Sequence, residues 1–122
     1  MRMVKILLLS LIALGLIFSS AFAMKHLPEE RGKTMFNDPK FSGGTVACSS
    51  CHPDGKGLEK AGSKKEWKTP AGATKTLEDA INLCIVNANK GKALDVKSDQ
   101  MKDMVAYIKS LGKPAQKEAP KK

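Results

Sequence analysis

The chain has 122 residues, of which 42% are hydrophobic but only 5% are aromatic, and its formal net charge is +9. That length fits one small domain, which buries a modest core and usually needs a disulfide, a metal or a cofactor to hold it together. The lysines behind the charge are not interleaved with aromatic residues, which argues against nucleic acid as a partner.

The N-terminal segment has the three parts of a secretory signal peptide. Arg2 and Lys5 give a basic start, residues 6–18 are almost wholly apolar, and a stretch of small residues ends at Ala23. We expect a signal peptide over residues 1–23 that is cleaved after Ala23, with an uncleaved membrane anchor as the alternative. Either outcome predicts an exported, periplasmic domain.

The rest of the chain divides into one domain over residues 24–112 and a basic, flexible tail over residues 113–122. The domain opens with a predicted helix. Pro28 stands in its first turn, and acidic residues 29–30 suit the positive end of the helix dipole. Residues 37–39, Asn-Asp-Pro, end it.

A long stretch without periodicity follows the first helix. Residues 53–73 are rich in Gly, Lys, Ser and Pro, and Trp67 is their only large apolar residue. We predict a loop here and expect no strand anywhere in the chain. Loops of this length in a compact domain usually wrap a ligand or carry function.

Two further helices are predicted near the C-terminus. Thr76 is a candidate N-cap with Asp79 three residues later, and Gly91 closes that segment; its apolar face comprises Leu77, Ile81, Cys84, Ile85 and Ala88. Ser98 caps the last helix, which ends at Gly112; its apolar stripe comprises Met101, Met104, Val105, Ile108 and Leu111. The predicted fold class is all-α, with three main helices and a long loop.

Cys48, Cys51 and His52 form a C-x-x-C-H motif, which is typical of c-type haem attachment. On one turn of helix, the two cysteines can meet the two vinyl groups of one porphyrin, and the histidine then projects toward the iron. We predict one covalently attached haem c, held by Cys48 and Cys51 as thioethers, with His52 as the proximal iron ligand. A haem at the centre of the core would also explain how so few aromatic residues suffice.

Three other uses of the motif fit less well. A structural zinc site normally needs four well-spaced ligands, and few candidates remain elsewhere in the chain. A thioredoxin-like redox pair would need a preceding strand and a βαβ context, for which there is no pattern. A disulfide between Cys48 and Cys51 would close a very small, strained loop.

Taken together, these features resemble the class I c-type cytochromes. The resemblance covers roughly residues 27–112, through the export signal, the early helix, the sequence CSSCH and the terminal MKDMVAYIKSLG. In that family the first and last helices cross beside the haem edge. The resemblance implies that Gly32 and Phe36 meet Tyr107 and Ile108 at this crossing.

The second axial ligand departs from the usual pattern of that family, which takes a methionine from the loop before the last helix. Residues 87–99 contain no methionine, and Met101 and Met104 lie within the last helix, where core packing is the ordinary role. Cys84, the odd third cysteine, lies on the apolar face of its own helix. We prefer Cys84 as the distal ligand and keep Met101 as the alternative, with water, lysine or an open site as further options.

Residues 76–111 also resemble the haem domains of thiosulfate dehydrogenases and related sulfur-cycle cytochromes. They share Ile-Asn-x-Cys, Gly-Lys-x-Leu and Ser-x-x-Met. In the dehydrogenases that cysteine ligates the catalytic haem, and the matching residue here is Cys84. Those enzymes are dihaem proteins, however, whereas this chain has one haem motif, so the resemblance does not carry their activity over with the ligand.

The expected function is that of an exported monohaem electron carrier rather than a catalyst. The alternative is a haem subunit or enzyme of thiosulfate oxidation, and a haem-based gas sensor would require a weak sixth ligand. Lysines dominate residues 56–75 and recur at Lys90, Lys92 and Lys97, so we expect redox partners with acidic docking surfaces. A membrane is expected to take part only if the N-terminal segment is not cleaved.

Overall fold

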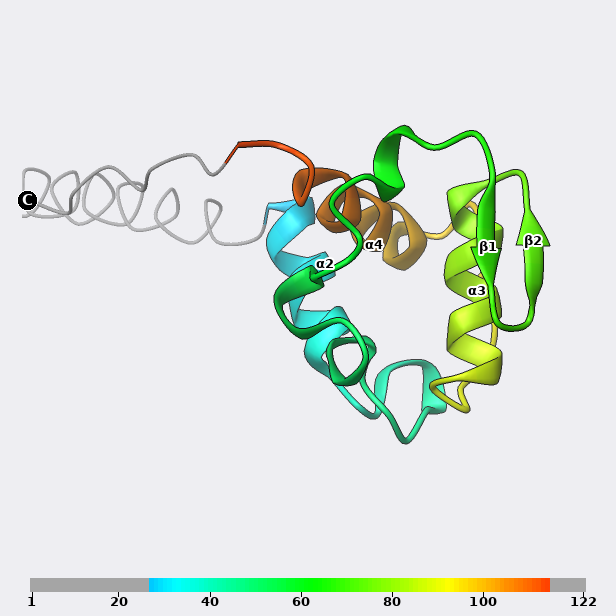
Figure 1. Cartoon of the computed structure of the whole chain (residues 1–122). Helices are drawn as coiled ribbons and strands as arrows, with labels where there is room; N and C mark the ends of the chain where they lie inside the picture. Colours follow the sequence, from blue (N-terminus) through cyan, green and yellow to red (C-terminus); the bar gives the residue numbers. More distant parts are fainter. Residues whose placement is uncertain (1–26, 115–122) are drawn as a thin grey trace, which may run out of the picture.

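The computed structural model describes residues 27–114, so the predicted signal peptide and the end of the basic tail lie outside the described residues. The described part contains three α-helices, α2 (Pro28–Asn37), α3 (Leu77–Asn87) and α4 (Asp99–Ser110), with several short 3₁₀ turns between α2 and α3. It also contains a hairpin of β1 (Trp67–Thr69) and β2 (Gly72–Thr74), which pair in antiparallel register (Figure 1). No helix among residues 27–114 is long and apolar enough to cross a membrane.

The predicted helices and their caps are confirmed. The Thr76 hydroxyl accepts a hydrogen bond from the backbone N–H of Asp79 at 3.1 Å, and the Ser98 hydroxyl accepts one from the N–H of Met101 at 3.2 Å. Each of these bonds satisfies a donor that the first turn of a helix leaves without a partner. Pro28 begins α2, where a missing N–H costs nothing.

The expected crossing of the first and last helices is confirmed as well. A Cβ atom on Gly32 would lie 2.1 Å from the backbone oxygen of Asp103 and 2.6 Å from Cβ of Tyr107, so only glycine permits this approach. One turn further along α2, the rings of Phe36 and Tyr107 meet edge to face with centroids 5.1 Å apart. The two helices therefore pack directly against each other.

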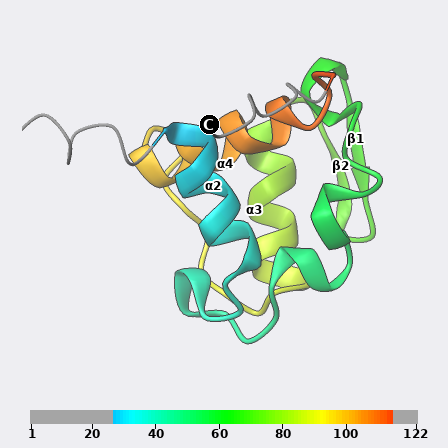
Figure 2. The same ribbon diagram turned by 90° about the vertical axis from the view of Figure 1, so that its left-hand side faces the viewer.

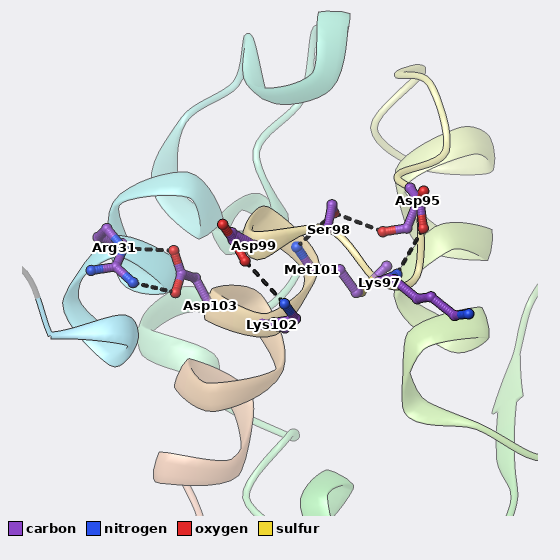
Figure 3. Close-up of polar contacts among 8 residues, drawn as sticks. All are labelled: Arg31, Asp95, Lys97, Ser98, Asp99, Met101, Lys102 and Asp103. Carbon is purple, nitrogen blue, oxygen red and sulfur yellow. Dashed lines mark hydrogen bonds and ion pairs between the residues drawn. The ribbon is translucent and has the colours of Figure 1, made fainter.

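An ion pair joins the same two helices at the edge of the crossing. Nε and Nη2 of Arg31 donate to the two carboxylate oxygens of Asp103 at 2.6 and 2.7 Å (Figure 3). Asp103 is buried although it is charged, and a two-pronged contact of this kind satisfies both of its oxygens. The pairing joins residues 72 positions apart, and the sequence pattern did not predict it.

Helix α3 lies between the crossed pair and the hairpin, as both views of the ribbon indicate (Figures 1 and 2). The side chain of Asn82 holds the segment that returns from α3 to α4. Its Nδ2 donates to the carbonyl of Leu94 at 2.9 Å, and its Oδ1 accepts from the N–H of Leu94 at 2.8 Å. The half-buried side-chain amide of Asn82 thus supplies hydrogen bonds that regular secondary structure would otherwise provide in this connection.

Two details of the prediction were wrong. Residues 53–73 were expected to contain no strand, yet the hairpin occupies their end, because three-residue strands are too short to show an alternating pattern. Ala88 was placed on the apolar face of α3, but it is exposed because the helix ends at Asn87; Ala80 is buried instead. The fold class itself, mostly helical with three helices, is as expected.

Candidate functional site: a cavity at the C-x-x-C-H motif

A cavity of about 360 Å³ opens between the motif, the hairpin and the three helices. That volume falls in the range of roughly 300 to 1,000 Å³ that is usual for small-molecule and cofactor sites. Most of its wall is apolar. The residues that line it include Phe36, Leu58, Ala61, Trp67, Leu77, Ala80, Ile81, Met104 and Ile108.

The cysteine motif forms a tight turn at the edge of this cavity. Residues Cys48–Ser50 are a 3₁₀ turn, and the carbonyl of Cys48 accepts from the N–H groups of both Cys51 and His52, at 3.2 and 3.0 Å. Cys48 lines the cavity, whereas Cys51 is exposed and is not among the lining residues. All three cysteines are free thiols, so no disulfide forms among residues 27–114.

His52 also lines the cavity, and its ring orientation is set by the chain that follows it. Nδ1 lies 3.0 Å from the carbonyl oxygen of Lys56. A carbonyl can only accept a hydrogen bond, so Nδ1 carries a proton in this contact, and in the neutral ring the lone pair lies on Nε2. This is the arrangement that a metal-binding histidine uses, with one nitrogen donating to the protein and the other available as a ligand.

The candidate distal ligands lie in different surroundings. Cys84, on α3, lines the cavity together with Cys48 and His52. Met101, on α4, has no exposed surface, belongs to the hydrophobic core and is not among the described residues that line the cavity. Met104, one turn further along α4, does line it.

The two cavity thiols are both held in the protonated form. Burial raises the pKa of Cys84, and the nearby Cys48 and Cys51 raise it further. Burial also raises the pKa of Cys48, while a hydrogen bond from Asn89 acts in the opposite direction. The cavity therefore disfavours an unpartnered thiolate, which a bound metal would stabilise.

The open side of the cavity carries positive charge. Lys64 and Lys68 line it and are exposed. The Trp67 N–H is satisfied by the carbonyl of Ala61 at 2.9 Å, which leaves the ring free to serve as wall. Among the described residues that line the cavity, the lysines at positions 90, 92 and 97 do not appear.

A second depression of about 570 Å³ lies on the outer side of α3 and β2. None of the candidate haem-attachment or iron-ligand residues lines it. Its wall includes exposed positions such as Lys75, Val86 and Asn87. Because chemistry rather than size identifies a site, we assign function to the cavity at the motif.

The sequence did not reveal two residues at the site. Met104 was expected to serve only as core packing, yet it also faces the cavity. Asn89 is buried and donates from Nδ2 to the sulfur of Cys48 at 3.2 Å. A polar residue just after a helix usually caps it or faces solvent, so nothing in the local pattern indicated this contact, which spans 41 positions.

The described residues fit a covalently bound haem. They provide an apolar cavity, a free thiol in its wall with a second one a turn away, and a histidine with one nitrogen available. Among residues 27–114, the motif included, no three His, Cys, Asp or Glu side chains converge to form a metal site by themselves. A haem still fits, because the porphyrin ring itself supplies most of the ligands to the iron and the protein has to supply only the remainder.

Comparison with known proteins agrees with this chemistry. The family model of the SoxA/TsdA cytochrome c domain matches residues 31–115. A thiosulfate dehydrogenase from Psychrobacter arcticus is 35% identical over 83 residues, which is 60% of this chain and 24% of that enzyme, so the chain spans about a quarter of the relative's length. No solved structure matches. The chain belongs to the SoxA/TsdA cytochrome c domain family, whose members bind haem c covalently and take part in electron transfer.

Proposed function

We propose that this chain is an exported monohaem c-type cytochrome that carries single electrons between redox partners. The observation that carries the proposal is the cavity that brings Cys48, His52 and Cys84 into one apolar enclosure. When bound there, haem supplies a one-electron couple between ferric and ferrous iron. Export is supported by the basic, apolar and small-residue sequence of residues 1–23.

Each residue of the motif has a separate role in this proposal. The thiols of Cys48 and Cys51 would anchor the cofactor, and a tight turn separates the two residues. His52 offers Nε2 to the iron while Nδ1 holds the ring against the carbonyl of Lys56. That hydrogen bond also raises the basicity of the ligand nitrogen.

We assign the distal position to Cys84 and keep Met101 as the alternative. Cys84 faces the cavity, whereas Met101 would have to leave the packed core to reach it. The choice sets the chemistry, because an anionic thiolate favours the ferric state and lowers the reduction potential, while a thioether raises it. A thiolate ligand would therefore make this chain a low-potential carrier.

The positive rim suggests how partners dock. Lys64 and Lys68 flank the open side of the cavity, where an electron would enter or leave. Acidic patches on a partner would be steered toward this rim, and the encounter rate would fall as salt screens the charges. Replacing both lysines by glutamine should lower that rate and weaken its dependence on salt.

A second candidate function is thiosulfate oxidation, either directly or as one haem domain of an oxidising system. It is favoured by the similarity to a thiosulfate dehydrogenase and by the position of Cys84. The relative is about four times longer than the matched segment, and its activity depends on the whole enzyme rather than on the matched quarter alone. We therefore rank electron transfer first.

The test is to purify the full chain after expression with a cytochrome c maturation system. Acid-stable haem at one per chain, with reversible one-electron cycling and no thiosulfate turnover, is the expected result. Turnover of thiosulfate with an artificial electron acceptor would move the assignment to the second candidate. Absence of covalent haem would overturn both.

A further inference from the structure

Asn89 bonds to two residues that line the cavity, Cys48 and Cys84. Its side-chain Nδ2 donates to the sulfur of Cys48 at 3.2 Å, and its backbone N–H donates to the carbonyl of Cys84 at 3.0 Å. The residue is buried, with 5% of its surface exposed. One amino acid thus bonds both to the attachment cysteine and to the helix that carries the candidate distal ligand.

The backbone around Asn89 strengthens this connection. Its carbonyl accepts from the N–H of Thr45 at 2.9 Å and from that of Val46 at 3.4 Å, in the segment that leads into the motif. Three residues later, the N–H of Lys92 donates to the carbonyl of Ser42 at 2.8 Å. The segment that leaves α3 therefore runs beside the segment that enters the C-x-x-C-H turn, and a buried amide stands where they meet.

From these contacts we infer that Asn89 is a positioning residue for Cys48, whose amide holds the sulfur at a defined place in the cavity wall for thioether formation. The inference rests on the proposed attachment of haem at Cys48 and Cys51. Cys51 has no such partner and is exposed, so the two thiols are not equivalent. The Cys48 sulfur bonds to a residue in the segment that follows α3, whereas the backbone N–H of Cys51 bonds within the local turn.

The bond that Asn89 would assist needs no oxidant or reductant. The thiol adds across a vinyl group, so that the S–H bond and the C=C π bond are lost, a C–S bond forms, and the hydrogen goes to the other vinyl carbon. The mass of the product therefore equals the sum of the masses of the chain and the haem. The correct sulfur must meet the correct carbon, so a mobile sulfur lowers the yield of one linkage without altering the other.

The test compares Asn89→Ala with the unaltered chain after maturation. The chain is denatured and alkylated, and mass spectrometry then locates the alkylated cysteine. Losing a hydrogen bond of ordinary strength should raise the fraction of chains with a free, alkylated Cys48 about fivefold, while Cys51 stays linked. The pyridine haemochrome band should move to longer wavelength as well, because the unreacted vinyl group stays conjugated with the ring.

Two variants separate the hydrogen bond from packing. Asn89→Asp keeps the shape but replaces the donor with a carboxylate, so it should share the defect. Asn87→Ala is the matched control, because Asn87 is an exposed amide that bonds only to the carbonyl of Leu83, in its own helix. Wild-type behaviour of Asn89→Asp beside a defective Asn89→Ala would overturn the inference, as would full linkage of Cys48 in both.

A double variant decides the matter if Asn89→Ala yields too little protein. In a Cys48→Ala background the amide has no sulfur to hold, so adding Asn89→Ala should change the haem yield no further. An equal loss in both backgrounds would assign Asn89 a purely structural role. Failure of the proposed function itself appears separately, as absence of acid-stable haem from the unaltered chain.

Discussion

The α2–α4 crossing and the motif cavity represent two ways of completing a small fold. At the crossing, Gly32 removes a side chain so that two helices touch, and Phe36 and Tyr107 fill the next layer. In the cavity, Cys48 and Cys84 stand in a wall that encloses about 360 Å³ of space. Side chains alone fill the first region, whereas the second encloses a cavity of a size suited to a cofactor.

This contrast explains how a domain with so few aromatic residues can form a stable core. Protein interiors are normally packed to high density, and a cavity of this size costs stability unless something fills it. A rigid, apolar ring in the cavity would provide the van der Waals contacts that side chains otherwise provide in a protein core. The large side chains of the domain can therefore pack at the α2–α4 crossing, while a cofactor fills the cavity at the motif.

The largest effect is expected from Gly32→Ala at the crossing. The new Cβ would overlap the backbone oxygen of Asp103, and the backbone cannot yield without moving α4. We expect the free energy of unfolding to fall by about 4 kcal/mol, the upper end for one substitution. Denaturant unfolding of the haem-loaded protein measures it, with the exposed Lys33→Ala on the same helix as control. Equal stability of the two variants would mean that the helices do not touch as described.

Met101→Ala should mainly lower the stability of the protein, whereas Cys84→Ala should mainly change its absorption spectrum. Met101 is a fully buried core residue, so its truncation should cost about 3 kcal/mol of stability and leave the Soret and near-infrared bands unchanged. Cys84→Ala should change those bands, because it removes the proposed ligand from the cavity. Absorption spectra and unfolding curves of both variants provide the comparison. A changed spectrum in Met101→Ala with an unchanged one in Cys84→Ala would reverse the ligand assignment.

Asp103→Asn should have a smaller effect, confined to the crossing. It keeps the shape of the side chain but removes the charge that pairs with Arg31 (Figure 3). We expect a lower free energy of unfolding, with a difference from wild type that shrinks as ionic strength rises, because Arg31 is partly exposed. Unfolding curves at low and high salt measure this, while the haem spectrum should remain that of the unaltered protein. A loss that salt does not reduce would point to packing instead.

The smallest effect is expected at alkaline pH. Burial raises the pKa of Tyr107, and the charge of Asp54 raises it further, so folding favours the protonated phenol. That contribution is present below the unfolded pKa of about 10 and is lost as pH rises through the higher folded value. Tyr107→Phe should therefore lose less stability than wild type between neutral and strongly alkaline pH. Parallel loss in both proteins would contradict a raised pKa of Tyr107.

Local pattern was sufficient for much of the fold. The caps at Thr76 and Ser98 mark where helices begin because a side-chain oxygen and an orphan N–H lie within one turn of each other. The C-x-x-C-H motif indicated its own chemistry for the same reason, since its spacing places the groups on one short turn. The hairpin was missed because its strands are too short to carry a period.

What the sequence by itself determined is therefore what neighbouring residues decide: the three helices, the attachment motif and the apolar face on which Cys84 lies. Only the tertiary structure decided which side chains from distant segments meet. It paired Arg31 with Asp103, brought Asn89 to the sulfur of Cys48, and placed Met104 rather than Met101 at the cavity. The physical reason is that these contacts depend on how helices cross and how close they come, and no local periodicity encodes that distance.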